Sequence, residues 1–250
     1  MTNEIYGIDY LRRRLADKQT RVLLRYKYYE MKNNAQDFSS LAPEKFKGLK
    51  ETVGWCAKAV DSLADRLQFD EFQNDEFNLS EIFLSNNQDI LIDSAVLSAL
   101  ISACSFVYIR EDNGYPRLQV IDGSNATGII DPVTNLLTEG YAVLERDSMG
   151  VVKTEAYFMA GMTEIYSHGV LVQRIPNAAP YALLVPIIYR PDAKRPFGHS
   201  RISRACIAYT QTALRTIKRS EVSAEFYSFP QKYVLGLSED AEFNNRLAAI

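Results

Sequence analysis

Histidine is almost missing from this sequence, whose 250 residues include only His168 and His199. Two histidines are too few for most histidine-based metal sites and leave little basis for a Ser-His-Asp or Cys-His mechanism. His168 lies in a Ser-His-Gly sequence typical of a solvated turn, and for His199 a capping or packing role is expected ahead of contact with a phosphate. The phosphate-binding patterns GxxxxGKS, GxxxxGKT and GxGxxG and the zinc pattern HExxH are absent as well. We expect a protein that is not an enzyme and that holds neither a metal nor a cofactor.

Cysteine and long apolar runs are also scarce. The three cysteines are an odd number without CxxC spacing, which argues against a disulfide framework and a zinc site. Each lies among apolar residues, so we expect three buried, reduced thiols. The most apolar segment, residues 95–109, is shorter than the roughly 20 residues that cross a bilayer. It predicts a core helix that runs into a strand, and no membrane partner.

The composition is that of a folded protein, with 47% hydrophobic and 24% charged residues. A formal net charge of −3 and a pI of about 5.6 exclude a general nucleic-acid-coating protein, so any contact with a polyanion must be local. Charge is segregated along the chain: residues 65–93 contain eight acids and a single base, Arg66. This acidic block is a candidate for contact with a basic segment of a neighbouring copy, although acidic blocks are more often solvated loops.

The spacing of apolar residues predicts an α+β fold. Steps of three or four residues indicate helices in the first third, and short β-rich runs separated by turn sequences indicate a meander of antiparallel strands in the middle. Pro176, Pro180 and Pro186 predict an irregular connector after it. Helices are predicted at residues 8–31, 43–67, 79–105 (broken at 86–87) and 201–228, and strands at 106–110, 117–121, 127–130, 137–146, 151–158, 163–166 and 170–175. A last strand is predicted at 232–235 and a helix from 238.

The most informative stretch is residues 194–220, which hold seven Lys/Arg and no Asp or Glu. Ser200 is a good N-cap for the helix that follows, after the chain-breaking Pro196 and Gly198. At about 100° per residue, the bases fall within one arc of roughly 100°. These are Arg201, Arg204, Arg215, Lys218 and Arg219. The opposite arc, predicted to pack, holds Ile202, Ala205, Cys206, Tyr209, Ala213, Ile217, Ala224 and Tyr227.

The basic arc has two interpretations. Most amphipathic helices with a basic face are surface helices whose charges lie in water. Solvated helices, however, usually mix charges of both signs for i,i+4 pairing. In a purely basic stripe the positive charges repel one another unless a phosphate or an acidic neighbouring subunit neutralises them.

Four segments, spread over nearly the whole chain, resemble segments of one known protein family in the same order. Residues 26–31 (YKYYEM) resemble the aromatic patch that closes the first helix of that family, and residues 55–67 (WCAKAVDSLADRL) resemble its second helix. Residues 95–109 resemble its alanine- and leucine-rich helix leading into a Phe-Val strand. The strongest match is residues 197–202 (FGHSRI), followed by a long helix and residues 229–236 (FPQKYVLG). Through these segments the chain resembles the portal proteins of tailed bacteriophages, specifically the Gp6-like branch.

The resemblance implies a division of the chain and a function. Residues 1–190 would form a wing-like α+β domain, 191–230 a stem-like helix, and 231–250 the start of a clip-like region that continues beyond this sequence. Twelve copies would form a ring at one capsid vertex, through which the terminase large subunit pumps double-stranded DNA. Further implied partners are capsid and scaffolding proteins and a head–tail adaptor, and the implied location is the virion, or the host cytoplasm during assembly. The five bases of the stem-like helix would face the channel or a neighbouring subunit.

Two alternatives belong to other classes. One is an oligomeric head–tail connector or minor capsid protein without a DNA channel. The other is an enzyme acting on nucleic acid, in which acids such as Asp61, Asp65, Asp70 and Glu71 would hold Mg²⁺. The spacing of these acids does not favour that enzyme over a solvated helix end.

Overall fold

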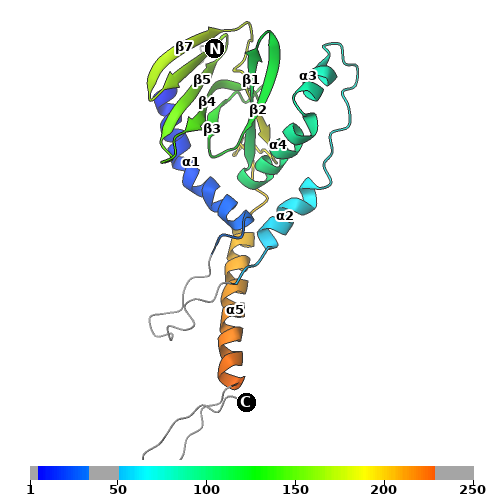
Figure 1. Ribbon diagram of the computed structural model, residues 1–250, viewed down its shortest axis with the longest axis vertical. Helices are drawn as coiled ribbons and strands as arrows, with labels where there is room; N and C mark the ends of the chain where they lie inside the picture. Colours follow the sequence, from blue (N-terminus) through cyan, green and yellow to red (C-terminus); the bar gives the residue numbers. More distant parts are fainter. Residues whose placement is uncertain (1–4, 34–50, 229–250) are drawn as a thin grey trace, which may run out of the picture.

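The structure is a computed structural model that describes residues 5–33 and 51–228. It has an α+β fold, as predicted, in which helices surround two antiparallel sheets and a long helix projects from the body (Figure 1). The helices are α1 (Ile8–Tyr29), α2 (Trp55–Ala64), α3 (Leu79–Ser85), α4 (Gln88–Ser102) and α5 (Arg204–Ser228). The strands are β1 (Cys104–Asp112), β2 (Tyr115–Ile121), β3 (Ala126–Ile130), β4 (Leu137–Arg146), β5 (Val152–Met159), β6 (Met162–Ser167), β7 (Val170–Pro176) and β8 (Leu184–Ile188).

The two sheets share one core. Strands β3 to β7 form a five-stranded meander in sequence order, and β1 lies between β2 and β8 in a three-stranded sheet. Side chains alternate across the meander, so that Ala142, Ala156 and Phe158 face the core shared with Phe106 and Tyr108 of β1.

The outer face of the meander packs against α1. Tyr141, Val143 and Tyr157 form a separate cluster with Leu11 and Leu15 of that helix. Each of these faces is built from every second residue of β4 and β5, which is why both strands are largely buried. The strands β4 and β5 are therefore covered on both sides, by the smaller sheet and by α1, whereas β7 at the edge of the meander is exposed.

Several local predictions are confirmed. The two-residue hairpin between β1 and β2 is formed by Asn113 and Gly114, both at positive φ, as the type I′ geometry requires. The predicted break at residues 86–87 separates α3 from α4, where Asn87 adopts the left-handed conformation. The apolar segment 95–109 is indeed a helix that runs into a strand, with Ala103 at φ 89° between them.

Other predictions were wrong. The middle third contains two sheets, because the stretch predicted as an irregular connector includes β8, which pairs with β1. Pro186 is tolerated there because β8 is an edge strand, where a missing N–H can face away from the sheet. Helix α2 begins at Trp55, after a non-helical stretch ending at Gly54, and ends at Ala64. The part of this predicted helix before residue 51, the predicted strand at 232–235 and the helix from 238 lie outside the described residues.

Candidate functional site

The start of α5 differs from the predicted one. Ser200 does not cap the helix: its hydroxyl donates to the Ile101 carbonyl (2.6 Å) and accepts the Ile202 amide (3.0 Å). The cap is Ser203, whose Oγ accepts the Cys206 amide at 3.1 Å. The helix therefore begins at Arg204, because a contact with the end of α4 holds Ser200 in the preceding connection.

A tight connection before α5 fixes where the helix leaves the body. Gly198 has φ +72°, and a Cβ at this position would lie 2.2 Å from the Tyr189 carbonyl oxygen. The His199 amide donates to that same carbonyl (2.9 Å), and the Arg201 amide donates to the Leu100 carbonyl (2.8 Å). Glycine is required here because a side chain would collide with the backbone and because φ lies in the left-handed region. Through these hydrogen bonds, residues 197–202 connect the end of β8 and the end of α4 to the start of α5.

Arg201 is not part of the helical stripe. It precedes α5, and its Nε donates to the Ala59 carbonyl of α2 at 3.0 Å. This hydrogen bond ties the connection before α5 to the middle of α2. The place of Arg201 in the predicted basic arc was wrong because that arc assumed a helix from residue 201.

The remaining four bases divide into two kinds. Arg204, Arg215 and Arg219 are exposed on α5, as predicted. Lys218 is only 2% exposed and takes part in an interaction with its surroundings. Burial of a lysine stem is common where the apolar carbons can pack and the ammonium finds a partner. On α5 itself, the exposed bases of the predicted arc are therefore Arg204, Arg215 and Arg219.

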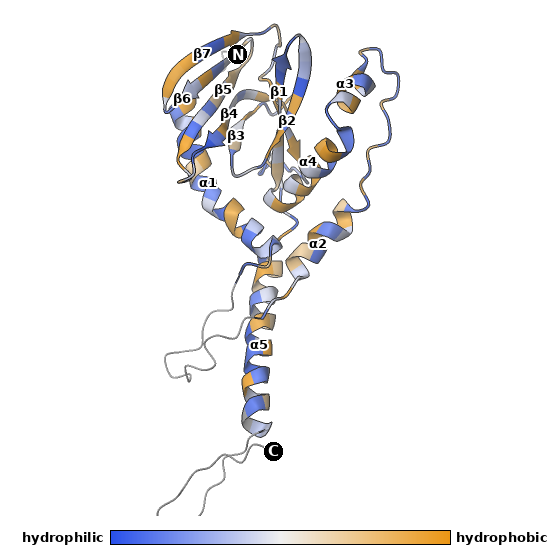
Figure 2. Ribbon diagram, viewed as in Figure 1, coloured by the Kyte–Doolittle hydropathy of each residue, from blue (hydrophilic) through white to orange (hydrophobic). Residues whose placement is uncertain are grey.

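The packed face of α5 is also rotated relative to the predicted one. Thr210 and Leu214 are buried, and Cys206 is partly buried. Ile202, which precedes the helix, is buried as predicted. Tyr209 (68% exposed) and Tyr227 (86%), which were predicted to pack, are exposed instead, and so is Ile217. Figure 2 shows apolar and polar residues alternating along the projecting part of the helix. Part of the apolar surface of α5 is thus uncovered in the single chain.

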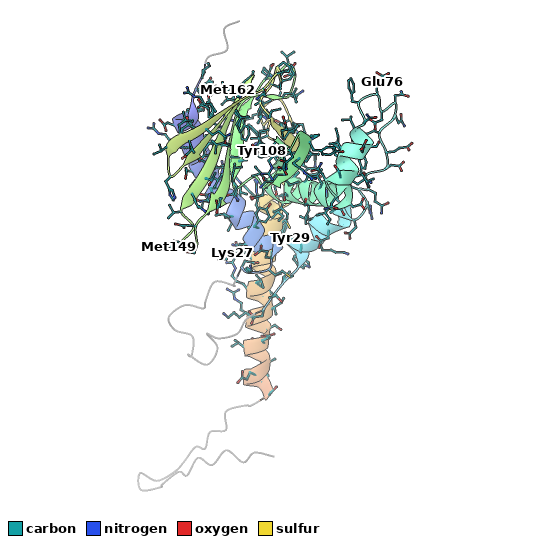
Figure 3. The ribbon with its side chains drawn as sticks, turned by 45° about the horizontal axis from the view of Figure 1, so that its top comes forward. Lys27, Tyr29, Glu76, Tyr108, Met149 and Met162 are labelled. Carbon is teal, nitrogen blue, oxygen red and sulfur yellow. The ribbon has the colours of Figure 1, made fainter. Side chains whose placement is uncertain are left out.

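The helix is anchored where it meets the body. Its first turns pack through Cys206 and Ile207 against a cluster that includes Tyr28 of α1 and Val60 of α2. Gln211 donates to the Tyr28 hydroxyl at 2.5 Å. Nearby, the Tyr29 hydroxyl donates to Asp61 (3.0 Å), and burial followed by this bond raises the pKa of Tyr29 to about 12. Tyr29 marks this junction in Figure 3.

The acidic block is spread over the end of α2, the following loop, α3 and the start of α4. All its acids are exposed except Asp75, which is half-buried and caps α3 by accepting the Leu79 (2.6 Å) and Ser80 (2.8 Å) amides. Hydrogen bonds from Ser80 and from the neighbouring amides lower the pKa of Asp75. Glu76 lies near the outer end of this part of the molecule (Figure 3), and Phe77 close to it is 77% exposed. The block is therefore accessible from outside.

The two histidines are both accounted for. His168 lies in the turn between β6 and β7 with φ 47°, so the predicted turn is confirmed. His199 does not cap a helix: its Nε2 lies 2.5 Å from Asp192 Oδ2, on the exposed connection before α5. This contact, together with backbone amides, lowers the pKa of Asp192.

Sequence reasoning missed a pair of buried carboxylates beneath α1. Glu139 accepts the amides of Tyr6 and Gly7 (2.9 Å each) and the Tyr157 hydroxyl (2.6 Å). Glu155 accepts two donors of Arg12 and the Tyr141 hydroxyl. Both acids occupy strand positions that fit ordinary alternation of polar and apolar residues, so no motif indicated them.

A hollow of about 370 Å³ lies beside Glu155 between α1 and the five-stranded sheet. Arg12, Tyr141 and Arg146 are among the residues that line it. These polar groups are paired within the protein, since Arg12 and Tyr141 bind Glu155 and Arg146 donates to Asn125. We interpret this network as the anchor that holds α1 on the sheet.

Familiar signs of metal binding or membrane insertion are missing from the described part of the chain. Within residues 5–33 and 51–228, no three His, Cys, Asp or Glu side chains gather closely enough to hold a metal ion. Among the helices described, none combines the length and apolarity that crossing a membrane requires. The chain matches no protein-family model and no curated protein.

Proposed function

We propose that this protein is a portal subunit of a tailed bacteriophage, a non-catalytic component of a ring through which double-stranded DNA enters and leaves the capsid. The observation that carries the proposal is α5. It projects from an α+β body, is anchored at its first turns, and carries exposed arginines (Figure 1). The segment with the strongest resemblance to the portal family, residues 197–202, lies at the junction from which this helix leaves.

The charge on α5 suits a surface along which DNA slides. Each phosphate that a protein neutralises tightens binding through the release of counterions, so a dense basic patch would grip DNA. Arg204, Arg215 and Arg219 form a sparse set along a helix of 25 residues. Repeated around a ring, such a set favours contact without tight binding. The arginines would face the channel or the acidic block of a neighbouring copy.

Uncovered apolar surface supports self-association. Tyr209 and Tyr227 of α5 are exposed, and so are Val170 and Val172 of the edge strand β7. A head-to-tail ring requires two different complementary patches on each subunit. The exposed acids near Phe77 and the arginines of α5 lie on separate parts of the molecule and have opposite charge, as such an interface requires.

Negative-stain images of the purified protein test the ring. We expect annular particles of about twelve copies with a central hole, the symmetry that the resemblance implies. Oligomers without a hole would contradict the channel and favour a head–tail connector or minor capsid protein.

Binding of double-stranded DNA as a function of salt tests the role of the arginines. Replacing Arg204, Arg215 and Arg219 together with Gln should flatten the dependence of log K on log salt by about 0.9 for each phosphate that the variant no longer neutralises. The matched control replaces three exposed arginines of the body, Arg13, Arg66 and Arg110, with Gln. An equal change in both variants would show that α5 has no special role in contacting DNA.

A further inference from the structure

Two cysteines that are far apart in the sequence meet at the junction of α2 and α5. Cys56 is in the first turn of α2 and Cys206 in the first turn of α5, and their Sγ atoms lie 3.2 Å apart. They meet because both helices bury their first turns in the same cluster, with Val60 and Ile202. The prediction that all three cysteines are buried is confirmed for Cys56 and Cys104 and wrong for Cys206, which is only partly buried.

The surroundings of the two sulfur atoms differ. Cys56 is completely buried, whereas Cys206 is partly exposed. The Thr210 hydroxyl lies 3.5 Å from the Cys56 Sγ. The third cysteine, Cys104, is buried in the core between the two sheets, in a different cluster. The chain thus has one reachable thiol, one buried partner in contact with it and one cysteine that serves as an internal control.

We propose that Cys56 and Cys206 form an oxidation site, at which a small-molecule disulfide such as oxidised glutathione converts the two thiols into a disulfide that locks α5 to α2. The S–S bond is about 2.05 Å long, so the sulfur atoms need to approach by only about 1 Å. A shift of this size is within the reach of side-chain torsions at a helix junction.

The exposure of the two thiols sets the order of the reaction. Cys206 loses its proton to solvent and attacks one sulfur of the reagent, which forms a mixed disulfide and releases one reagent thiol. Cys56 then loses its proton and attacks the Cys206 sulfur, which releases the second reagent thiol. In total, two protein thiols are oxidised and one reagent disulfide is reduced to two thiols. Burial raises the pKa of Cys56 to about 11, which agrees with its role as the second, resolving group.

The disulfide would act on the α5 anchor described above. The first turns of this helix are held by packing and by hydrogen bonds, while the rest projects from the body (Figure 1). A covalent bond at this point restricts pivoting of the helix against α2. It also closes a loop between residues 150 positions apart, which restricts the unfolded chain.

Thiol counting tests the site. The folded protein is incubated with oxidised glutathione, then denatured and alkylated with iodoacetamide, and its mass is measured. We expect the number of alkylated thiols to fall from three to one, and a digest to contain one linked peptide pair with Cys56 and Cys206. The oxidised protein should also unfold at a higher temperature than the reduced protein.

Variants separate this pair from other reactions of cysteine. Cys104→Ser should go from two alkylated thiols to none, and Cys206→Ser should keep both of its thiols and show no rise in unfolding temperature. If Cys206→Ser does not fold, the wild type and Cys104→Ser decide the question. Three alkylated thiols after oxidation, a stable glutathione adduct on Cys206 in the wild type, or a disulfide between two copies would each overturn the proposal.

Discussion

Replacing Glu139 with Gln tests the buried carboxylate that binds the start of α1 from the five-stranded sheet. The Glu139 residue is 4% exposed, and its carboxylate accepts three hydrogen bonds, from the Tyr6 and Gly7 amides and the Tyr157 hydroxyl. The amide of glutamine has nearly the same shape but one acceptor oxygen and no charge. Its NH₂ group must therefore point at one of these donors.

The cost follows from the hydrogen bonds that the glutamine cannot make. A hydrogen bond to a charged group contributes about 1.5–3 kcal/mol, and a buried donor left without a partner costs about 1–3 kcal/mol. We expect Glu139→Gln to lower the free energy of unfolding by about 2–4 kcal/mol. Hydrogen exchange should also speed up at the Tyr6 and Gly7 amides, whose acceptor is weakened.

A matched control lies on the same strand. Glu145 binds Lys153 at 2.6 Å, but both side chains are about half exposed, so this ion pair is screened by water. We expect Glu145→Gln to lower the free energy of unfolding far less than Glu139→Gln does. Urea denaturation followed by circular dichroism measures both variants. Equal costs for Glu139→Gln and Glu145→Gln would refute the reasoning, because burial would then make no difference to the value of the carboxylate.

Three further predictions concern the connection before α5, the buried tyrosines and the buried lysine. Gly198→Ala should lower the unfolding temperature by several degrees or prevent folding, because the alanine Cβ would collide with the Tyr189 carbonyl and because φ at this position is +72°. A thermal melt equal to that of the wild type would contradict this. Burial and bonds to carboxylates raise the pKa of Tyr141 and Tyr157, so the folded state keeps protons that the unfolded state releases above about pH 10. Stability is therefore complete below about pH 10 and falls as pH rises beyond it, and urea midpoints between pH 8 and 11 should show a smaller loss for Tyr157→Phe. Lys218→Ala should destabilise the protein by about 1–3 kcal/mol, because the lysine is buried, and Arg215→Ala by less than about 0.5 kcal/mol. Similar urea midpoints for the two variants would show that burial of the lysine does not stabilise the fold.

Local sequence was sufficient for most elements, because their signals lie within a few residues. The Asn113-Gly114 turn and the break at Asn87 depend on the ability of these residues to adopt positive φ. β8 could not be predicted in the same way. Its Pro186 is typical of a connector, and it becomes part of a strand only because β1 offers an unpaired edge.

The sequence predicted the helix that carries the candidate site, but some of the residues assigned to its basic and packed faces were wrong. The basic character of residues 194–220 identified the projecting helix, but Arg201 lies before it and Lys218 is buried. The angle of a residue around a helix follows from its number, whereas the side of the helix that packs depends on what the rest of the chain places against it. That is why Tyr209 is exposed and Thr210 is buried.

The sequence by itself determined the α+β class, the meander of strands and a long helix that carries bases and no acids up to residue 220, because these follow from periodicity, turn chemistry and composition. Only the tertiary structure decided which contacts join distant segments: Glu139 to the start of α1, Ser200 to the end of α4, and Cys56 to Cys206. The physical reason is that such pairs are separated by about a hundred residues or more. Nothing in the local sequence around either partner encodes the other, and they meet only when burial of apolar surface brings their elements together.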